Sequence, residues 1–209
     1  PKQPEKKDPF FNKTVDPKAP PEEKVHHTHS DRFGKDPLRY DGNPFFEGNV
    51  KFEHQGSTLT ADIVILYQEQ NFVKAIGNVK LINPDGSVIT AGEWEYDGET
   101  QRGIARKNVI LTDPKQTIKT ETLYYDRVSN KAYFNTGGTI YANNSVTYVK
   151  NATYNTDTKI INLTNNIKIE NDQYTLIGDK IVKDQNTNIQ TINVPAPISN
   201  KKNTRNILY

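Results

Sequence analysis

The sequence predicts an all-β protein in which about five bent hairpins of about 29 residues stack one on another. Three observations predict this fold: apolar and polar residues alternate, turn residues interrupt the alternation at regular intervals, and apolar positions recur at a fixed spacing. Alternation with a period of two indicates strands with one buried face. A repeat of this length indicates stacked supersecondary units, and no segment has a convincing helical period.

Residues 1–24 are predicted to form a flexible leader, because they hold half of the chain's 12 prolines with lysines and acids between them. Such a segment buries too little apolar surface to offset the entropy of ordering it. The tail, residues 196–209, has a similar composition, which leaves 25–195 as the predicted β domain. Because the chain begins at Pro1, we expect that a signal peptide has been removed and that the protein is exported.

The first strand of each unit carries a small residue or Asn, then a β-branched residue, a polar residue and an apolar one. A polar segment follows each strand, rich in residues that tolerate or preset turn dihedrals. Each unit therefore begins with a strand and a tight reversal. These strands are 48–52, 77–81, 107–111 and, more loosely, 138–142 and 165–169, and the turns are 54–56, 83–86, 113–115, 143–145 and 171–173.

The second strand of each unit gives the strongest evidence for the repeat, because four columns of residues keep one spacing. Successive members of every column stand 30, 29, 29 and 29 residues apart. Within a unit the columns are two, three and two residues apart, so the odd step predicts a bulge or corner in the strand. Gly48 and Gly77 are predicted to bend the first strands in the same way. The columns are Leu59, Ile89, Ile118, Thr147, Leu176; Ala61, Ala91, Thr120, Val149, Gly178; Val64, Trp94, Leu123, Ala152, Ile181; and Leu66, Tyr96, Tyr125, Tyr154, Lys183.

Seven stretches of these strands and turns together carry a family resemblance. They are residues 29–31, interpreted as an opening strand, 46–54, 59–62, 75–79, 95–98, 107–111 and 123–126. This run resembles the OstA-like family, whose fold the periplasmic lipopolysaccharide-transport proteins share, and most closely the longer OstA-like proteins of Bacteroidetes-type bacteria. The resemblance spans roughly residues 25–195. The fourth unit departs from the pattern at 137–139 and 150–153, and the fifth ends on Lys183 in place of an aromatic residue.

The resemblance implies an open, twisted antiparallel β-jellyroll whose apolar interior shields the acyl chains of lipopolysaccharide. It implies a non-enzymatic periplasmic protein, without a cofactor, that passes the lipid toward the outer membrane. The expected partners are lipopolysaccharide or lipid A, and other transport jellyrolls or further copies of this chain, joined through edge strands. The candidate lipid-binding residues are Val50, Phe52, Leu59, Ala61, Val64, Leu66, Val79, Leu81, Ile89, Ala91, Trp94, Tyr96, Val109, Leu111, Ile118, Leu123, Tyr125, Ile140, Ile167, Ile169, Leu176 and Ile181.

The same inward residues fit a second interpretation, in which they form the fully packed core of a structural or adhesive β-repeat protein. Small residues at Ala61, Ala91 and Gly178 favour a trough, because a densely packed core would fill that space. Trp94 is the only tryptophan; its inward position makes burial the default and ligand contact the sharper hypothesis. The three tyrosines of the fourth column are interpreted as a structural aromatic ladder beside polar turns, with ligand contact as the alternative.

Composition argues against several other functions. The net charge of +2 comes from 27 basic and 25 acidic residues that are interspersed, which argues against a nucleic-acid footprint. No apolar run reaches about 18 residues, so no transmembrane segment is predicted. The absence of cysteine excludes thiolate metal sites and thiol nucleophiles.

The motifs also disfavour metal binding and catalysis. The aspartates that recur in the turns fit ordinary turn residues better than convergent calcium ligands. The histidines of residues 26–29 are interpreted as part of an edge strand, with a zinc or copper site as the alternative. No nucleophile elbow, phosphate loop or defined pair of His and carboxylate is present. Glu93 and Glu95 share a strand face, as the carboxylates of a polysaccharide-cleaving enzyme would, but the predicted face is the outward one.

Overall fold

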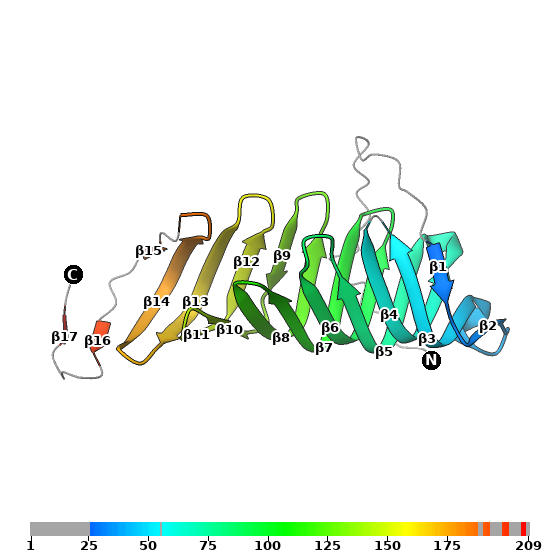
Figure 1. Ribbon diagram of the computed structural model, residues 1–209, viewed down its shortest axis with the longest axis horizontal. Coiled ribbons are helices and arrows are strands. Elements are labelled where there is room, and N and C mark those ends of the chain that lie inside the picture. The colour runs from blue at the N-terminus through cyan, green and yellow to red at the C-terminus, as the bar shows by residue number, and fades with distance from the viewer. Residues whose placement is uncertain (1–25, 55, 188–189, 193–197, 201–205, 208–209) are drawn as a thin grey trace, which may run out of the picture.

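The structure is a computed structural model that describes residues 26–54, 56–187, 190–192, 198–200 and 206–207. It confirms the predicted all-β jellyroll: the described strands belong to one antiparallel sheet of 17 strands, which follow one another along the long axis of the molecule (Figure 1). The predicted leader, residues 1–24, lies outside the described residues, as does most of the predicted tail, so the boundaries of the domain stay predictions.

The strands of the five repeat units fall where the alternation and the turn segments placed them, whereas the opening strand does not. Two 3-10 helices, Tyr40–Gly42 and Gln68–Gln70, complete the described elements, and no helix among them is long enough to cross a membrane. The strands are β1 (His26–His29), β2 (Arg32–Lys35), β3 (Pro44–His54), β4 (Ser57–Tyr67), β5 (Phe72–Ile82), β6 (Val88–Asp97), β7 (Arg102–Asp113), β8 (Gln116–Asp126), β9 (Lys131–Phe134), β10 (Gly138–Ala142), β11 (Ser145–Val149), β12 (Asn151–Asn155), β13 (Ile160–Glu170), β14 (Tyr174–Asp184), β15 (Gln190–Ile192), β16 (Ile198–Asn200) and β17 (Asn206–Ile207).

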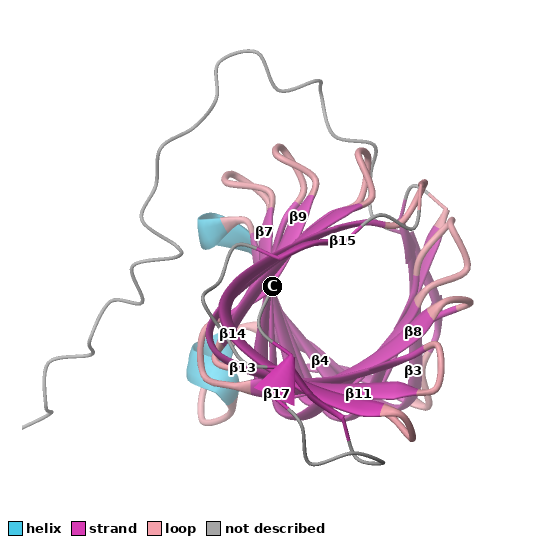
Figure 2. Cartoon of the chain, turned by 90° about the vertical axis from the view of Figure 1, so that its left-hand side faces the viewer, coloured by secondary structure: helices cyan, strands magenta, loops and turns pink. Residues whose placement is uncertain are grey.

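Each long strand bends once, at a bulge, and this bend folds the single sheet into two facing halves. In β3 the bend falls at Gly48 and Asn49, and in β5 at Gly77 and Asn78, all four with positive φ between 44° and 78°. Glycine adopts this conformation without the steric cost that other residues bear. The strand halves on either side of the bends curl around a common axis (Figure 2).

The bends divide the sheet into two facing halves, called sheet 1 and sheet 2. Sheet 1 contains residues 50–54 and 57–61 of the first hairpin and their repeats, and its hairpin turns, including 83–87 and 113–116, form rim 1. Sheet 2 contains residues 45–47 and 63–65 with their repeats, and its turns, including 126–131 and 155–160, form rim 2. The bends between the two sheets form the corner, so the molecule has a closed corner side and a side where the two rims face each other.

The corner closes by fitting a small residue on one strand against a side chain on the next. A Cβ at Gly77 would lie 2.3 Å from Asp62 Oδ2, and Asn78 Nδ2 donates a hydrogen bond to that oxygen at 2.9 Å. At the β6–β7 corner the roles are exchanged. Gly92 supplies the space, and its Cβ, if added, would stand 2.8 Å from the Cβ of Lys107, which adopts a left-handed φ of 69°.

The opening strand differs from the expectation. Residues 29–31 were expected to form one strand, but His29 ends β1, Ser30 and Asp31 form a break, and Arg32 begins β2. The break lies at the corner, where Asp31 N donates to Gly48 O at 2.9 Å and the Asp31 carboxylate accepts from Asn49 Nδ2 at 3.0 Å. The histidines of β1 pair with β3 as an edge strand, as predicted.

The departure of the fourth unit has a structural counterpart. There the strands do not bend but break, so that β9 and β10 both pair with β8, and β11 and β12 both pair with β13. The breaks fall at residues 135–137 and at Lys150, the positions where the sequence departs from the pattern. The sheets remain continuous across this unit because the neighbouring long strands carry the register.

Inward side chains form two rows on each sheet, because directly paired residues of antiparallel strands point to the same face. The rows beside the bends, here the corner rows, are Val50, Ala61, Val79, Ala91, Val109, Val149 and Ile167 on sheet 1, and Phe46, Val64, Ala75, Trp94, Ala105, Leu123, Phe134, Ala152, Leu163 and Ile181 on sheet 2. The rows nearer the turns, here the rim rows, are Phe52, Leu59, Leu81, Ile89, Leu111, Ile118, Ile140, Thr147, Ile169 and Leu176, and Leu66, Val73, Tyr96, Gly103, Tyr125, Ala132, Tyr154, Ile161 and Lys183.

Candidate functional site

A cavity of about 620 Å³ lies between the two rim rows of the first units. Sheet 1 lines it with Phe52, Leu59, Leu81, Ile89 and Leu111, and sheet 2 lines it with Val73, Tyr96, Tyr125, Ala132 and Tyr154, while Trp94 reaches it from the corner row. Its volume lies within the range of about 300–1,000 Å³ that pockets for single small ligands have. The cavity is therefore an apolar space of ligand size inside the jellyroll.

The candidate residues divide between this cavity and a packed core. All of them belong to the buried apolar cluster or pack against it, but only those in the rim rows of the first units, together with Trp94, line the cavity. Those that line it are Phe52, Leu59, Leu81, Ile89, Trp94, Tyr96, Leu111 and Tyr125. Those that do not are Val50, Ala61, Val64, Leu66, Val79, Ala91, Val109, Ile118, Leu123, Ile140, Ile167, Ile169, Leu176 and Ile181.

The two interpretations of the interior thus apply to different layers. In the corner rows the side chains of the two sheets pack directly, as in a β-sandwich core; Val50, Val64 and Ile167 are fully buried there. In the rim rows of the first units the sheets stand apart and leave the cavity. The separation follows from the bend, since two sheets that meet at a corner diverge with distance from it.

The interior closes in the fourth unit. Phe134 is 2% exposed, and its ring reaches across the corner toward sheet 1, where a Cβ added to Gly138 would stand 2.6 Å from Phe134 Cζ. Beyond it Ile161, Leu163, Ile169 and other inward residues of the last two units are buried. The space beside Phe134 is only about 10 Å³, so the cavity does not continue into the packed interior beyond Phe134, although Tyr154 and the turns at Lys159 and Gln185 still border it on the sheet 2 side.

Trp94 occupies the same corner row as Phe134 but takes the opposite direction. Its indole lies toward rim 2, over Gly103, where an added Cβ would stand 2.5 Å from Trp94 Cζ2. Ala75 and Ala105, the direct neighbours of Trp94 on the flanking strands, leave room for the ring. Trp94 is 5% exposed and lines the cavity. The residue is therefore buried and also borders the space that a ligand could occupy.

Sequence reasoning missed the inward residues of the strand halves before each bend. Val73 and Ala132 line the cavity, and Phe134 ends it, yet none was among the candidates. Tyr154 also lines the cavity, which agrees with the alternative interpretation of its column and not with a purely structural ladder. The signal was present, because these half-strands keep the spacing of 30, 29 and 29 residues that the other columns keep. The columns are Val73, Gly103, Ala132, Ile161, and Ala75, Ala105, Phe134, Leu163.

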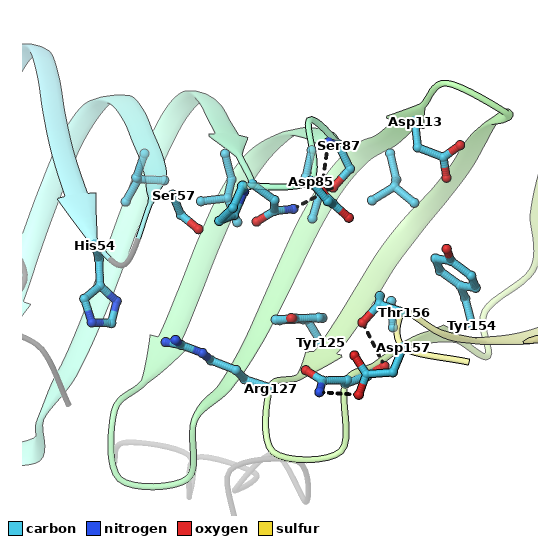
Figure 3. A pocket seen from close by; sticks show the side chains of 18 of the residues that line it. His54, Ser57, Asp85, Ser87, Asp113, Tyr125, Arg127, Tyr154, Thr156 and Asp157 are labelled. Carbon is cyan, nitrogen blue, oxygen red and sulfur yellow. Dashed lines mark hydrogen bonds between the residues drawn. The ribbon is translucent and has the colours of Figure 1, made fainter. Parts of the chain in front are cut away.

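The two rims give the cavity a polar border. Asp85, Ser87 and Asp113 lie on one side, Arg127, Thr156 and Asp157 lie on the other, and the rings of Tyr125 and Tyr154 lie between them (Figure 3). The rim acids act in their own turns, as predicted. For example, Asp113 Oδ1 accepts hydrogen bonds from the N–H groups of Lys115 and Gln116 at 2.8 and 3.0 Å.

At the far end of the cavity one lysine connects the two rims and a second lies beside Tyr154. Lys115 of rim 1 donates through Nζ to the carbonyl oxygen of Gln185 on rim 2 at 3.1 Å. Lys159 Nζ lies 5.9 Å from the centroid of the Tyr154 ring. Burial raises the pKa of the Tyr154 hydroxyl, and the charge and hydrogen bond of Lys159 oppose that rise.

The carboxylates that suggested an enzyme are held in ion pairs on the outer face of sheet 2. Glu93 accepts from Lys107 Nζ at 2.5 Å, and Glu95 accepts from Lys74 at 3.0 Å and from Arg106 at 2.5 Å. The hydrogen bond from Lys107 holds the pKa of Glu93 below its usual range. A general acid requires the opposite shift, so this pair is arranged for structure and not for proton donation.

The arrangement combines an apolar cavity, a polar border and aromatic hydroxyls at the boundary between them. Such a site buries hydrocarbon while a polar group stays at the rims. Burial of hydrocarbon is non-directional, which suits a flexible chain better than a rigid ring system.

Comparisons with known proteins give a family and a fold neighbour. The model of the family described as OstA-like protein matches residues 22–179. Among solved structures, the chain is similar to LptH, the LptA homologous periplasmic component of the conserved lipopolysaccharide transport device from Pseudomonas aeruginosa. That similarity has a TM-score of 0.46 and 16% identity, and covers 51% of this chain and 80% of LptH. No curated protein matches the chain.

Proposed function

Because the chain belongs to the OstA-like family, as the match over residues 22–179 shows, we propose that it is a periplasmic protein that shields the acyl chains of lipopolysaccharide. It holds them in the cavity between the rim rows and passes them toward the outer membrane. No chemical step is required of it, because binding and release of hydrocarbon are enough. The observation that carries this proposal is the apolar cavity between two sheets that are otherwise packed.

The affinity in this proposal comes from apolar burial. Each methylene removed from water contributes about 0.8 kcal/mol. Leucine, isoleucine and aromatic side chains from both rim rows line the cavity, so a chain would contact apolar atoms on two sides. The polar rims would keep a sugar or phosphate headgroup hydrated while the chains stay inside.

Passage between molecules would use the sheet edges. β1 and β2 lie at one end of the sheet, where both pair with β3. At the other end β15 and β16 pair with β14, and β17 pairs with β16. The outer backbone groups of edge strands such as β1, β2, β15 and β17 can pair with a strand of another chain. We propose that other transport jellyrolls or further copies of this chain join there.

The alternative, a structural or adhesive β-repeat protein, requires a filled interior. Most of the interior of the last two units meets that requirement, but the first three units do not, because a cavity separates their rim row on sheet 1 from the facing rim row of sheet 2, which contributes residues as far as Tyr154. This difference within one molecule favours ligand binding, since a purely structural repeat gains stability from packing every unit to the same density.

A photo-crosslinking experiment tests the proposal at matched positions. Benzoylphenylalanine is placed at Leu81, which lines the cavity, at Lys80, which is exposed on the opposite face of β5, and at Ile167, which is buried in the packed end. Lipopolysaccharide should be captured at Leu81 and at neither of the other two positions. Equal capture at Leu81 and Lys80 would indicate surface adsorption and would refute the proposal.

Emission of Trp94 gives a second, independent reading of the same site. Lipid A should shift the emission, because the indole lines the cavity, whereas a soluble glycan of similar charge should leave it unchanged. A shift of equal size with the glycan would place the effect on the rims and not in the cavity.

A further inference from the structure

Lys183 breaks the aromatic column at the end of the rim row. It pairs directly with Ile161, and Ile161 pairs with Tyr154, so all three side chains leave sheet 2 on its inward face. Ile161 is 4% exposed, and the Lys183 side chain beside it is partly buried. A lysine at an inward position is costly unless something compensates its charge.

Two further lysines approach this position from the rims. Lys115 reaches across from rim 1 to the Gln185 carbonyl at 3.1 Å, and Gln185 is 6% exposed. The N–H of Gln185 donates to the Lys159 carbonyl at 3.1 Å, which places the Lys159 turn against the same residue. Lys115 and Lys159 therefore both contact Gln185 and line the end of the cavity. Lys183 lies on β14, two residues before Gln185, close enough to Lys115 for the two charges to interact.

Within the described residues, none of these lysines forms an ion pair with a carboxylate. The nearest acids are occupied elsewhere. Asp113 accepts hydrogen bonds from N–H groups of its own turn, and Asp184 accepts one from the N–H of Asn186 at 2.8 Å. Asp85 accepts a hydrogen bond from the N–H of Ser87, and its interaction with the charge of Lys159 acts at longer range. Burial, and then the charge of Lys115, hold the pKa of Lys183 below its usual range.

We propose that Lys115, Lys159 and Lys183 form a binding site for the phosphate headgroup of the amphiphile whose chains occupy the cavity. This inference rests on the proposed function and adds to it a position for the headgroup. A phosphate monoester matches the site because its oxygens accept several charge-assisted hydrogen bonds at once. It would also supply a negative charge to three lysines that form no ion pair within the described residues and of which two, Lys159 and Lys183, are partly buried.

The site gives the ligand a direction. The headgroup lies at the rim of the fifth unit, and the chains run back along Leu111, Leu81 and Leu59 toward the N-terminal units, away from the end closed by Phe134. A chain placed the other way would set its methyl terminus against the ammonium groups and its phosphate among leucines, where the phosphate would lose its hydration without a partner.

The test compares lipid A that carries its phosphates with the same lipid after enzymatic dephosphorylation, using Trp94 emission to measure Kd. The wild type should bind the phosphorylated form about tenfold or more tightly, the usual effect of a charge-assisted contact. K115M and K183M should each lower that ratio, and the double variant should bring it near one. The control is K180M, which replaces an exposed lysine on the same strand. This variant should keep the wild-type ratio.

The outcomes separate the two proposals. A wild-type ratio of one, or a ratio unchanged in the double variant, overturns the phosphate site and leaves lipid binding standing. Failure of the wild type to bind either lipid overturns the proposed function. In that case inorganic phosphate is titrated against protein with ¹³C-labelled lysines. A saturable shift of the Lys183 Cε resonance would retain the site for free phosphate and remove the headgroup, and no shift would overturn the site as well.

Discussion

At the scale of single residues, the corners share a steric fit between two neighbouring strands, although the amino acids that make the fit differ from corner to corner. Asp62 fits against Gly77, and at the next corner Gly92 fits against Lys107. In each pair one residue lacks a side chain where the other has one. Sequence columns alone do not show this exchange, because the two members of a pair lie on different strands and fall in different columns.

This exchange predicts a rescue. G92D should destabilise the protein by about 1–3 kcal/mol, because the new Cβ meets Lys107 Cβ, which cannot move without its backbone. Adding K107G should recover most of that loss, since it removes the opposing Cβ, relieves a left-handed φ and recreates the Asp62–Gly77 pair. Urea unfolding of the two variants measures the difference. A double variant less stable than G92D would contradict the proposed fit.

Lys183 predicts a dependence of stability on pH. Its pKa is lower in the folded protein than in the unfolded chain, so the unfolded chain binds more protons between the folded pKa and about 10.4. Stability should therefore rise with pH across that window through this group. Tyr125 and Tyr154, whose pKa values are raised by burial, act in the opposite direction above about pH 10. The stability of the wild type minus that of K183M isolates the lysine, and this difference should increase with pH.

At the scale of elements, the aromatic residues in the corner row of sheet 2 decide where the interior is open. Leu81 on β5 and Leu176 on β14 are both leucines of the rim row on sheet 1, but Leu81 lines the cavity and Leu176 is 5% exposed in the packed end. The difference follows from the aromatic residues of the facing sheet. Trp94 leans toward the rim over Gly103, whereas Phe134 spans the corner to Gly138.

These two leucines of one row form a matched pair for a stability measurement. L176A should cost about 2–5 kcal/mol, because it opens a new void in a packed region. L81A should cost clearly less, because its side chain already borders an open space and no new enclosed void forms. Thermal or urea unfolding of both variants gives the comparison. Equal losses would mean that the interior around Leu81 is packed in solution.

At the scale of the whole molecule, the jellyroll is divided lengthwise into an open part and a filled part. On sheet 1 the cavity spans the first three units, from Phe52 to Leu111, whereas on sheet 2 it extends to Tyr154 and to the turn at Gln185. Phe134 separates it from the packed interior of the last two units. If the chain passes lipid along its length, the lipid must leave the cavity through the rims or the packed units must open.

A crosslinking profile along one rim row tests this division. Benzoylphenylalanine at Leu59, Leu81 and Leu111 should capture lipopolysaccharide, and the same group at Ile169 and Leu176 should not, because those positions are buried in the filled part. Mass spectrometry of the adducts measures the profile. Uniform capture along the row would show that the trough runs through all five units.

The sequence by itself determined the strands, the turns, the spacing of the units and the face to which each side chain points. Those properties depend on local periodicity. Leu59 of the first unit and Leu176 of the last therefore point inward in the same row of sheet 1, as their shared column predicts. Even the broken fourth unit was visible, as a departure from the pattern near Gly137 and Lys150. Only the tertiary structure decided which inward residues pack and which line a cavity. That choice depends on how far apart two facing sheets stand and on which way a ring such as Trp94 or Phe134 turns, and neither is a property of any one strand.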